Sequence, residues 1–328
     1  MERWTGVVNV SLSPTGPLFR VAASLLLISH AKTLNVPSLN AVFFNGDRVE
    51  GTGDPVVERL SEPTSIARSL VAKFGAGANA WVVTAPTFAG PFAVYRDFVP
   101  SVNSRGDPMG YDPDGFPAST TLAKILSRSV EEVKSMIWND QTEPVDTSMQ
   151  APVCPSSTAP PKTVVLGFSK GGSVVNQIIS ELAHLKLESA ENLNIGELSS
   201  ELLHESQYQI CPLSVDSLLY SISEFHYVDV GLNCRGAYIT NRDVIRKAVK
   251  NVLVNKDSAR FVLHGTPRQW CNQNRPWICE EKDLLLRLLK EEACKYEGKL
   301  QVCERFYFQE SPPSLKMHFE IIECMEIG

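Results

Sequence analysis

The chain has 328 residues, of which 43% are hydrophobic, and its formal net charge is −6. This length and hydrophobic content allow a large core to be buried in one α/β domain. The acidic balance and the absence of Lys/Arg runs argue against nucleic acid or an anionic membrane as the main partner. No apolar stretch approaches the roughly 18 residues that span a bilayer, so no transmembrane segment is expected.

The eight cysteines indicate ordinary thiols. They are scattered from Cys154 to Cys324 without any Cys-x-x-Cys spacing. In a chain of this size that pattern is typical of a reducing compartment, and it favours neither a disulfide framework nor a zinc site.

The chain is predicted to open with an antiparallel hairpin. Residues 7–13 and 19–28 are strand-like runs on either side of the turn cluster 14–17, Pro-Thr-Gly-Pro. We prefer this hairpin over a cleaved presequence, although residues 1–46 carry one acidic residue against three basic ones.

From residue 39 onward, strand-like and helix-like runs alternate. Strands are expected at residues 39–44, 80–85, 163–166, 224–231, 260–265 and 300–308. Helices are expected at residues 56–74, 120–138, 172–182, 241–254, 280–294 and 319–325, and the first of them is expected to break near 62–63. This alternation predicts a mainly parallel sheet flanked by helices on both faces. Residues 139–161 read as a flexible linker or surface insertion, and 188–223 as an insertion that could cap a site.

The strongest motif is Gly167-Phe-Ser169-Lys-Gly171. A β-branched apolar run ends at its first glycine, and apolar residues recur at helical spacing from residue 172 onward. Strand, Gly-x-Ser-x-Gly and helix in this order form the nucleophile elbow of α/β-hydrolases. The sharp turn strains the serine, so Gly167 and Gly171 must lack bulk. The alternative is a glycine-rich βα turn that only packs.

A nucleophilic serine needs a base, and the base needs an orienting acid. In this fold the partners follow the serine in the chain, each after a later strand. His318 follows the last expected strand and is the predicted base. His264 ends the preceding strand and is the alternative base, or else a strand-end histidine bonded to backbone near the site.

Asp229 is the predicted acid. It lies at the end of an expected strand, and the loop after the next strand, residues 265–275, contains no carboxylate. The alternative role for Asp229 is to cap its own loop. The predicted oxyanion donors are the N–H of Lys170 and that of Gly46 or Asp47, which follow the strand at residues 39–44. An ordinary βα turn is the alternative for residues 46 and 47.

Several short motifs together resemble one family. They are Phe-Phe-Asn-Gly-Asp at 43–47, Tyr-Arg-Asp-Phe-Val at 95–99, the elbow at 167–171, Tyr-Val-Asp-Val-Gly at 227–231, His-Gly-Thr-Pro at 264–267, Arg-Pro-Trp-Ile at 275–278 and Met-His-Phe at 317–319. From about residue 39 to the C-terminus the chain resembles the uncharacterised family of the chromosome 2 open reading frame 69 protein. The resemblance implies an α/β-hydrolase-like fold, with Ser169, Asp229 and His318 matching the family's serine, acid and histidine. It also implies a link to mitochondria, known for animal members.

We therefore expect residues 1–328 to form a single α/β-hydrolase-like domain that acts as a serine hydrolase on an ester, thioester or amide bond. The alternative is a non-catalytic protein of the same fold with a binding or regulatory role. No cofactor or metal is expected, and the partner is an unidentified small-molecule or acyl substrate, with a protein partner possible. The expected location is intracellular: mitochondrial by resemblance, or cytosolic because this N-terminus lacks a long Arg-rich leader.

Overall fold

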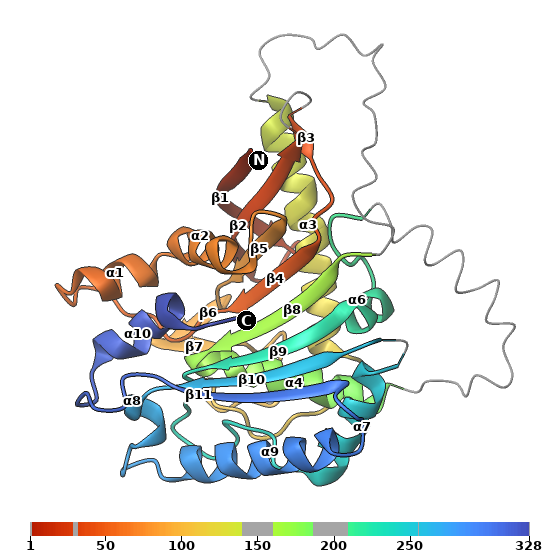
Figure 1. The fold of residues 1–328 in the computed structure, drawn as a ribbon. Coiled ribbons are helices and arrows are strands. Elements are labelled where there is room, and N and C mark those ends of the chain that lie inside the picture. Colours follow the sequence, from red (N-terminus) through yellow and green to blue (C-terminus); the bar gives the residue numbers. More distant parts are fainter. Residues whose placement is uncertain (1, 29–31, 140–159, 186–208, 255, 328) are drawn as a thin grey trace, which may run out of the picture.

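A twisted, mainly parallel sheet runs through the molecule (Figure 1). The computed structural model describes residues 2–28, 32–139, 160–185, 209–254 and 256–327. Among these residues the sheet has nine strands, which in spatial order are β1 Arg3–Ser11, β2 Leu18–Ile28, β5 Ala78–Val83, β4 Leu39–Phe44, β8 Lys162–Phe168, β9 Ile222–Val228, β10 Ala259–Gly265 and β11 Leu300–Phe306, with β3 Thr33–Leu34 paired to β2. The hairpin of β1 and β2 is antiparallel and joins β5 in antiparallel sense, whereas the pairs from β5 to β11 are parallel.

The strand order reverses between β4 and β8. From β4 the chain moves outward to β5, then returns across β4 to β8, and from there moves outward again through β9, β10 and β11. In open α/β sheets, ligands bind outside the carboxyl ends of the strands at such a switch point. The topology therefore brings the segments after β4 and β8 together at the place where this fold builds its sites.

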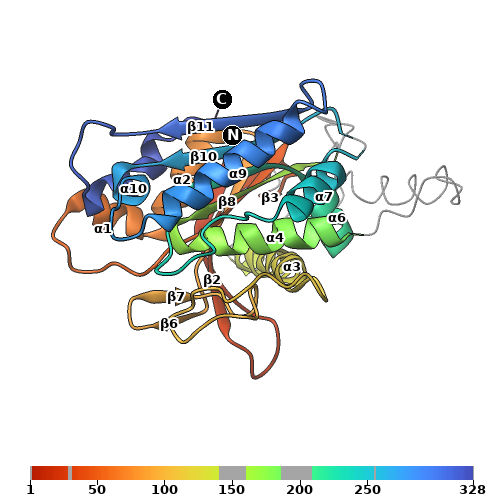
Figure 2. The same cartoon turned by 90° about the horizontal axis from the view of Figure 1, so that it is seen from below.

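Helices cover both faces of the sheet (Figures 1 and 2). One face packs against α3 Pro117–Asn139, α4 Gly172–His184, α7 Arg242–Val252 and α9 Trp277–Ala293, and the other against α1 Pro55–Ser61, α2 Pro63–Phe74 and α10 Leu315–Cys324. Two short helices, α6 Val215–Ser221 and α8 Pro267–Trp270, and the two-stranded hairpin β6 Thr87–Ala89 with β7 Phe92–Val94 complete the described elements.

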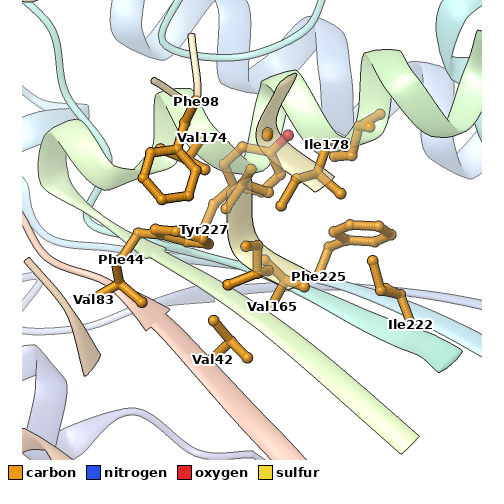
Figure 3. Close-up of a cluster of buried hydrophobic side chains, with 14 of the residues drawn as sticks. Val42, Phe44, Val83, Phe98, Val165, Val174, Ile178, Ile222, Phe225 and Tyr227 are labelled. Carbon is orange, nitrogen blue, oxygen red and sulfur yellow. The ribbon is translucent and has the colours of Figure 1, made fainter. Parts of the chain in front are cut away.

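The hydrophobic core is divided by the sheet into two clusters. Successive strand residues point to opposite faces, so Phe44 joins one cluster and Phe43 the other. Figure 3 shows the first cluster, in which Val174 and Ile178 of α4 face the sheet residue Val165. The elbow helix is thereby fixed to the strand that precedes it.

The fold confirms the expected α/β-hydrolase-like class. The N-terminal hairpin and the alternation after residue 39 are present, and the helix over residues 56–74 breaks between α1 and α2 as expected. Three local predictions differ: the β6–β7 hairpin was not expected, α10 begins at Leu315 instead of residue 319, and residues 215–223 form α6 and the start of β9. Residues 140–159 and 186–208, most of the expected linker and cap, lie outside the described residues.

The structure also bears on the cysteines and on membrane-spanning helices. The cysteines that the structure describes are all free thiols. Within the same described ranges, every helix is too short or too polar to cross a membrane.

Candidate active site

Ser169 lies at the turn between β8 and α4. Its φ of 52° is in the left-handed region, which a non-glycine residue adopts at a cost of order 1–3 kcal/mol when the surrounding structure imposes it. A Cβ on Gly171 would lie 2.2 Å from the carbonyl oxygen of Phe44, and one on Gly167 would lie 2.7 Å from that of Gly171. The backbone contacts around the elbow therefore require glycine at both positions.

The His318 side chain is held by Asp229. The imidazole Nδ1 lies 2.6 Å from Asp229 Oδ2. The carboxylate is fully buried, and it also accepts hydrogen bonds from the Thr266 N–H at 2.7 Å to Oδ1 and from the Thr266 hydroxyl at 2.9 Å to Oδ2. Both carboxylate oxygens are thus fixed, and an Nδ1–H donated to Asp229 leaves Nε2 of His318 as the acceptor that a general base needs.

Phe168, the last residue of β8, places His318 near the elbow. The ring of Phe168, the residue before Ser169, packs against the His318 ring with centroids 4.5 Å apart. Ser169 Oγ makes no hydrogen bond to any residue that the structure describes, His318 included. The nucleophile–base bond is often long or absent in unliganded hydrolases and forms when the substrate is bound.

Ser169 and His318 are both buried, with 7% and 6% of their surface exposed.

Gly46 lies against Ser169. A Cβ on Gly46 would lie 2.7 Å from Ser169 Cβ and 3.3 Å from Ser169 Oγ, so only glycine fits against the serine here. The Gly46 N–H donates to the Asn45 side-chain oxygen at 2.9 Å, and an oxyanion would have to share it. On the other side of the serine, Lys170 lies in the 3₁₀ turn Ser169–Gly171 that begins α4, where the first N–H groups have no intrahelical acceptor.

The Lys170 side chain ties the elbow to two loops. Its side chain is 2% exposed, and its Nζ donates to the Arg105 carbonyl at 2.7 Å. The same ammonium pairs with Asp107 Oδ1 at 3.3 Å and with Asp47 Oδ1 at 3.7 Å, and it lies 4.9 Å from the centre of the Phe92 ring. Burial raises the pKa of Asp47, and the Lys170 charge opposes that rise.

The carboxylate of Asp47 has a structural role besides the one predicted for its N–H. It accepts a hydrogen bond from the Ala93 N–H at 2.8 Å, which anchors β7 to the loop after β4. The two predicted oxyanion segments, residues 46–47 and Lys170, are joined by the partly buried ion pair of Asp47 with Lys170. Such a pair stabilises a fixed geometry mainly because removing one partner leaves an uncompensated buried charge.

His264 is engaged in a different network. It is fully buried on β10, where its Nε2 lies 3.0 Å from Nδ1 of His226 and its Nδ1 lies 3.1 Å from the Tyr307 hydroxyl. His226 in turn contacts Glu224 at 3.2 Å. Both ring nitrogens of His264 already have partners away from Ser169, as expected if this histidine supports the sheet next to the site.

This histidine pair predicts a pH-dependent stability. Burial lowers the pKa of His226, and burial together with the His226 charge lowers that of His264. The unfolded chain, with pKa values near 6.5, binds more protons than the folded one below that pH, so the free energy of unfolding falls as the pH drops. The pair contributes its full share of the free energy of unfolding above about pH 6.5. Below that pH, each histidine lowers the free energy of unfolding by about 1.4 kcal/mol for every pH unit.

The measurement is guanidinium unfolding of wild type and His264→Gln at pH 7.5 and 5.5. We expect the variant to lose less stability than wild type between the two pH values, by about 1 kcal/mol. Equal losses in both proteins would show that His264 is not held neutral.

Two features of the site were not predicted from the sequence. One is Thr266, which binds both oxygens of Asp229, and the other is the buried pairing of Lys170 with Asp107. The only sequence signal for Thr266 was its position directly after a strand, which it shares with many loop residues.

A separate cavity of about 650 Å³ opens among the loop that contains Tyr111, the loop that contains Gly236, and the helices α4, α7 and α9. None of Ser169, His318 and Asp229 lines it. This cavity is therefore distinct from the arrangement of Ser169, His318 and Asp229.

Comparison with solved structures gives distant similarities. The chain is similar to an IroE-like serine hydrolase from Shewanella oneidensis (10% identity, 98% of this chain and 78% of that one, TM-score 0.47). It is also similar to the siderophore hydrolase EstA from Aspergillus nidulans (12%, 96% and 91%, TM-score 0.45) and to a lipase/esterase from Lactobacillus plantarum (13%, 95% and 91%, TM-score 0.39). A search of curated proteins finds no match.

Comparison with family models gives a match to the C2orf69 family over residues 118–295. The matched region is 178 of the 328 residues and runs from the start of α3 to just beyond the end of α9. It contains the elbow, Asp229 and Thr266. Because the match covers more than half of the chain, the protein belongs to the C2orf69 family.

Proposed function

We propose that the protein is a serine hydrolase that cleaves an ester, thioester or amide bond with Ser169, His318 and Asp229. The observation that carries the proposal is the contact of 2.6 Å between His318 Nδ1 and Asp229 Oδ2, beside a serine on a strained strand-to-helix turn. These three residues come from three segments far apart in the sequence. Their roles as nucleophile, base and orienting acid follow the logic of the catalytic triad.

In the proposed reaction, Ser169 Oγ attacks the substrate carbonyl carbon while His318 Nε2 takes the hydroxyl proton. The resulting oxyanion would be held by the N–H of Lys170 and by that of Gly46 or Asp47. His318 then gives its proton to the leaving alcohol, thiol or amine, and an acyl-enzyme remains. Water, deprotonated by His318, attacks the acyl carbon, and the bond from that carbon to Ser169 Oγ breaks. His318 returns the proton to Oγ, and the carboxylic acid product leaves.

Asp229 keeps its charge throughout this cycle. It holds the imidazole through Nδ1 and stabilises the imidazolium that forms in each half-reaction. The buried Thr266 N–H and hydroxyl fix the carboxylate so that it does not rotate away from the ring.

The test is hydrolysis of p-nitrophenyl butyrate, of a butyryl thioester and of butyryl p-nitroanilide by wild type and His318→Gln. We expect the variant to lose at least about a thousandfold in kcat on whichever substrate wild type accepts, since general acid–base catalysis contributes up to about 10⁴. His184→Gln is the matched control, because His184 is exposed at the end of α4, where it lies beside Asp114 and Phe116. Equal rates in His318→Gln and wild type would contradict the proposed base.

A non-catalytic binding role is the second candidate. It is favoured by the Gly46 N–H, a predicted oxyanion donor that already donates to the Asn45 side-chain oxygen. A folded wild-type protein that hydrolyses none of these substrates would support it. Location in mitochondria, implied by the family resemblance, stays a prediction.

A further inference from the structure

The loop after β10, residues 265–275, carries two arginines and no carboxylate. Arg268 lies on α8 and Arg275 just before α9. Asn272 joins them: its Nδ2 donates to the Arg268 carbonyl at 3.4 Å, and its own carbonyl accepts the Arg275 N–H at 3.0 Å. One short turn therefore places both side chains at the same end of the sheet.

This end of the sheet is the one that carries the triad. Arg268 is two residues after Thr266, whose N–H and hydroxyl bind Asp229. The helix α8 also packs against α10, which contains His318. Asp229 is close enough to Arg275 for its charge to raise the Arg275 pKa, against the lowering caused first by burial and then by the Arg268 charge.

Neither guanidinium has a partner within the described part of the chain. Arg268 and Arg275 are both partly buried, and no described carboxylate pairs with either of them. The Arg268 Nε is completely covered yet has no hydrogen-bond acceptor. By contrast, Arg59, Arg242 and Arg260 each pair with a glutamate.

Two partly desolvated cations close to one another are costly unless an anion compensates them. Asp229 is engaged by His318 and Thr266, and no hydrogen bond or ion pair joins it to either arginine within the described residues. Guanidinium groups are the side chains that match the planar, two-oxygen geometry of carboxylates and phosphates. A carboxylate or a phosphate from outside the described chain would compensate the two guanidinium charges.

We propose that Arg268 and Arg275 form a binding site for an anionic group, a carboxylate or a phosphate, beside the triad. As a substrate subsite it rests on the proposed hydrolase function, and it then narrows the substrate to an acyl compound that carries a negative charge. A neutral substrate of the same length would leave both arginines unpaired and would bind less well.

The first test compares two matched esters, p-nitrophenyl hexanoate and mono-p-nitrophenyl adipate, which have the same chain length and differ in one terminal carboxylate. We expect wild type to prefer the adipate ester in kcat/KM, mainly through a lower KM. In Arg268→Gln/Arg275→Gln this preference should fall by about tenfold for each guanidinium removed, equivalent to about 1.4 kcal/mol each. Hydrolysis of the hexanoate ester should change by no more than about threefold.

Arg246→Gln is the control for loss of charge, because Arg246 is exposed on α7 and pairs with Asp243 at 3.0 Å. It should keep the wild-type preference. Labelling of Ser169 by a fluorophosphonate shows whether the triad of each variant is intact. Hydrolysis of both esters with no preference in wild type, or a preference kept in the double variant, would overturn the inference.

A second measurement separates this inference from the hydrolase proposal. If wild type neither hydrolyses the esters nor is labelled, the hydrolase function fails, and calorimetric titration with adipate and with inorganic phosphate decides the anion site alone. Binding of either anion that is lost in the double variant supports the site and shows whether it takes a carboxylate or a phosphate. Failure of wild type to bind either anion, or equal binding by the double variant, would overturn it.

Discussion

Ser169→Ala should reduce kcat for ester hydrolysis on the order of a million-fold if the protein uses the full triad, leaving only the residual rate enhancement from substrate binding and the oxyanion donors. The change removes one oxygen from the residue on which the elbow is built and leaves Gly46, Gly167 and Gly171 in place. Alanine meets the same left-handed backbone as serine does at φ 52°, so the turn should be retained.

The measurement is hydrolysis of the best wild-type substrate at matched protein concentration, with the thermal unfolding midpoint recorded for both proteins. The neighbouring serine of α4 provides a matched control: Ser173 is buried, and its hydroxyl donates to the Lys170 carbonyl. Ser173→Ala should retain activity within about tenfold, because it removes a hydrogen bond and no reacting group. Activity that survives in Ser169→Ala would show that hydrolysis arises elsewhere.

Asp229→Asn should lower kcat by about 10⁴ while the protein stays folded. The asparagine amide has the same shape, and asparagine tolerates the left-handed φ of 44° found at this position. Its oxygen can accept the Thr266 N–H, which turns its NH₂ group toward His318 Nδ1. That donor favours the imidazole tautomer with its proton on Nε2, which cannot accept the proton of Ser169.

Thr266→Val provides a graded comparison. It removes the hydroxyl that donates to Asp229 Oδ2 at 2.9 Å but keeps the backbone N–H bond to Oδ1. We expect a loss of activity well below that of Asp229→Asn, since the carboxylate keeps its charge and its bond to His318.

Asp229→Asn with activity within tenfold of wild type would mean that Asp229 only caps its loop.

The sequence was informative where the pattern is local. The elbow could be read from residues 163–182 because strand, glycine, serine and helix signals follow one another without interruption. The alternation of strands and helices also predicted the parallel sheet, since each parallel strand needs a crossover and these crossovers are helical. His318 could be selected because it follows the last strand in the chain.

The remainder of the site depends on packing between distant segments. His318 was expected in a loop, but Ser314 caps the helix by accepting the Met317 N–H, so α10 begins before the histidine. A lysine at the fourth position of the elbow motif reads as a surface residue from sequence alone. Its burial depends on Asp107, which lies more than 60 residues away and on a loop without regular structure.

The Arg268 and Arg275 pair illustrates the same limit. The sequence showed only that residues 265–275 lack a carboxylate. Whether the two arginines had partners could be judged only once the surrounding carboxylates were placed in space.

The central claim is that Ser169 is an activated nucleophile, and the most direct measurement is mass spectrometry of peptides from wild-type protein treated with a fluorophosphonate. The account predicts one phosphonyl group per chain, on the peptide that contains Ser169, with no labelling of Ser169→Ala and greatly slowed labelling of Asp229→Asn. A folded wild-type protein that stays unlabelled, or that carries the label on another residue, would contradict it.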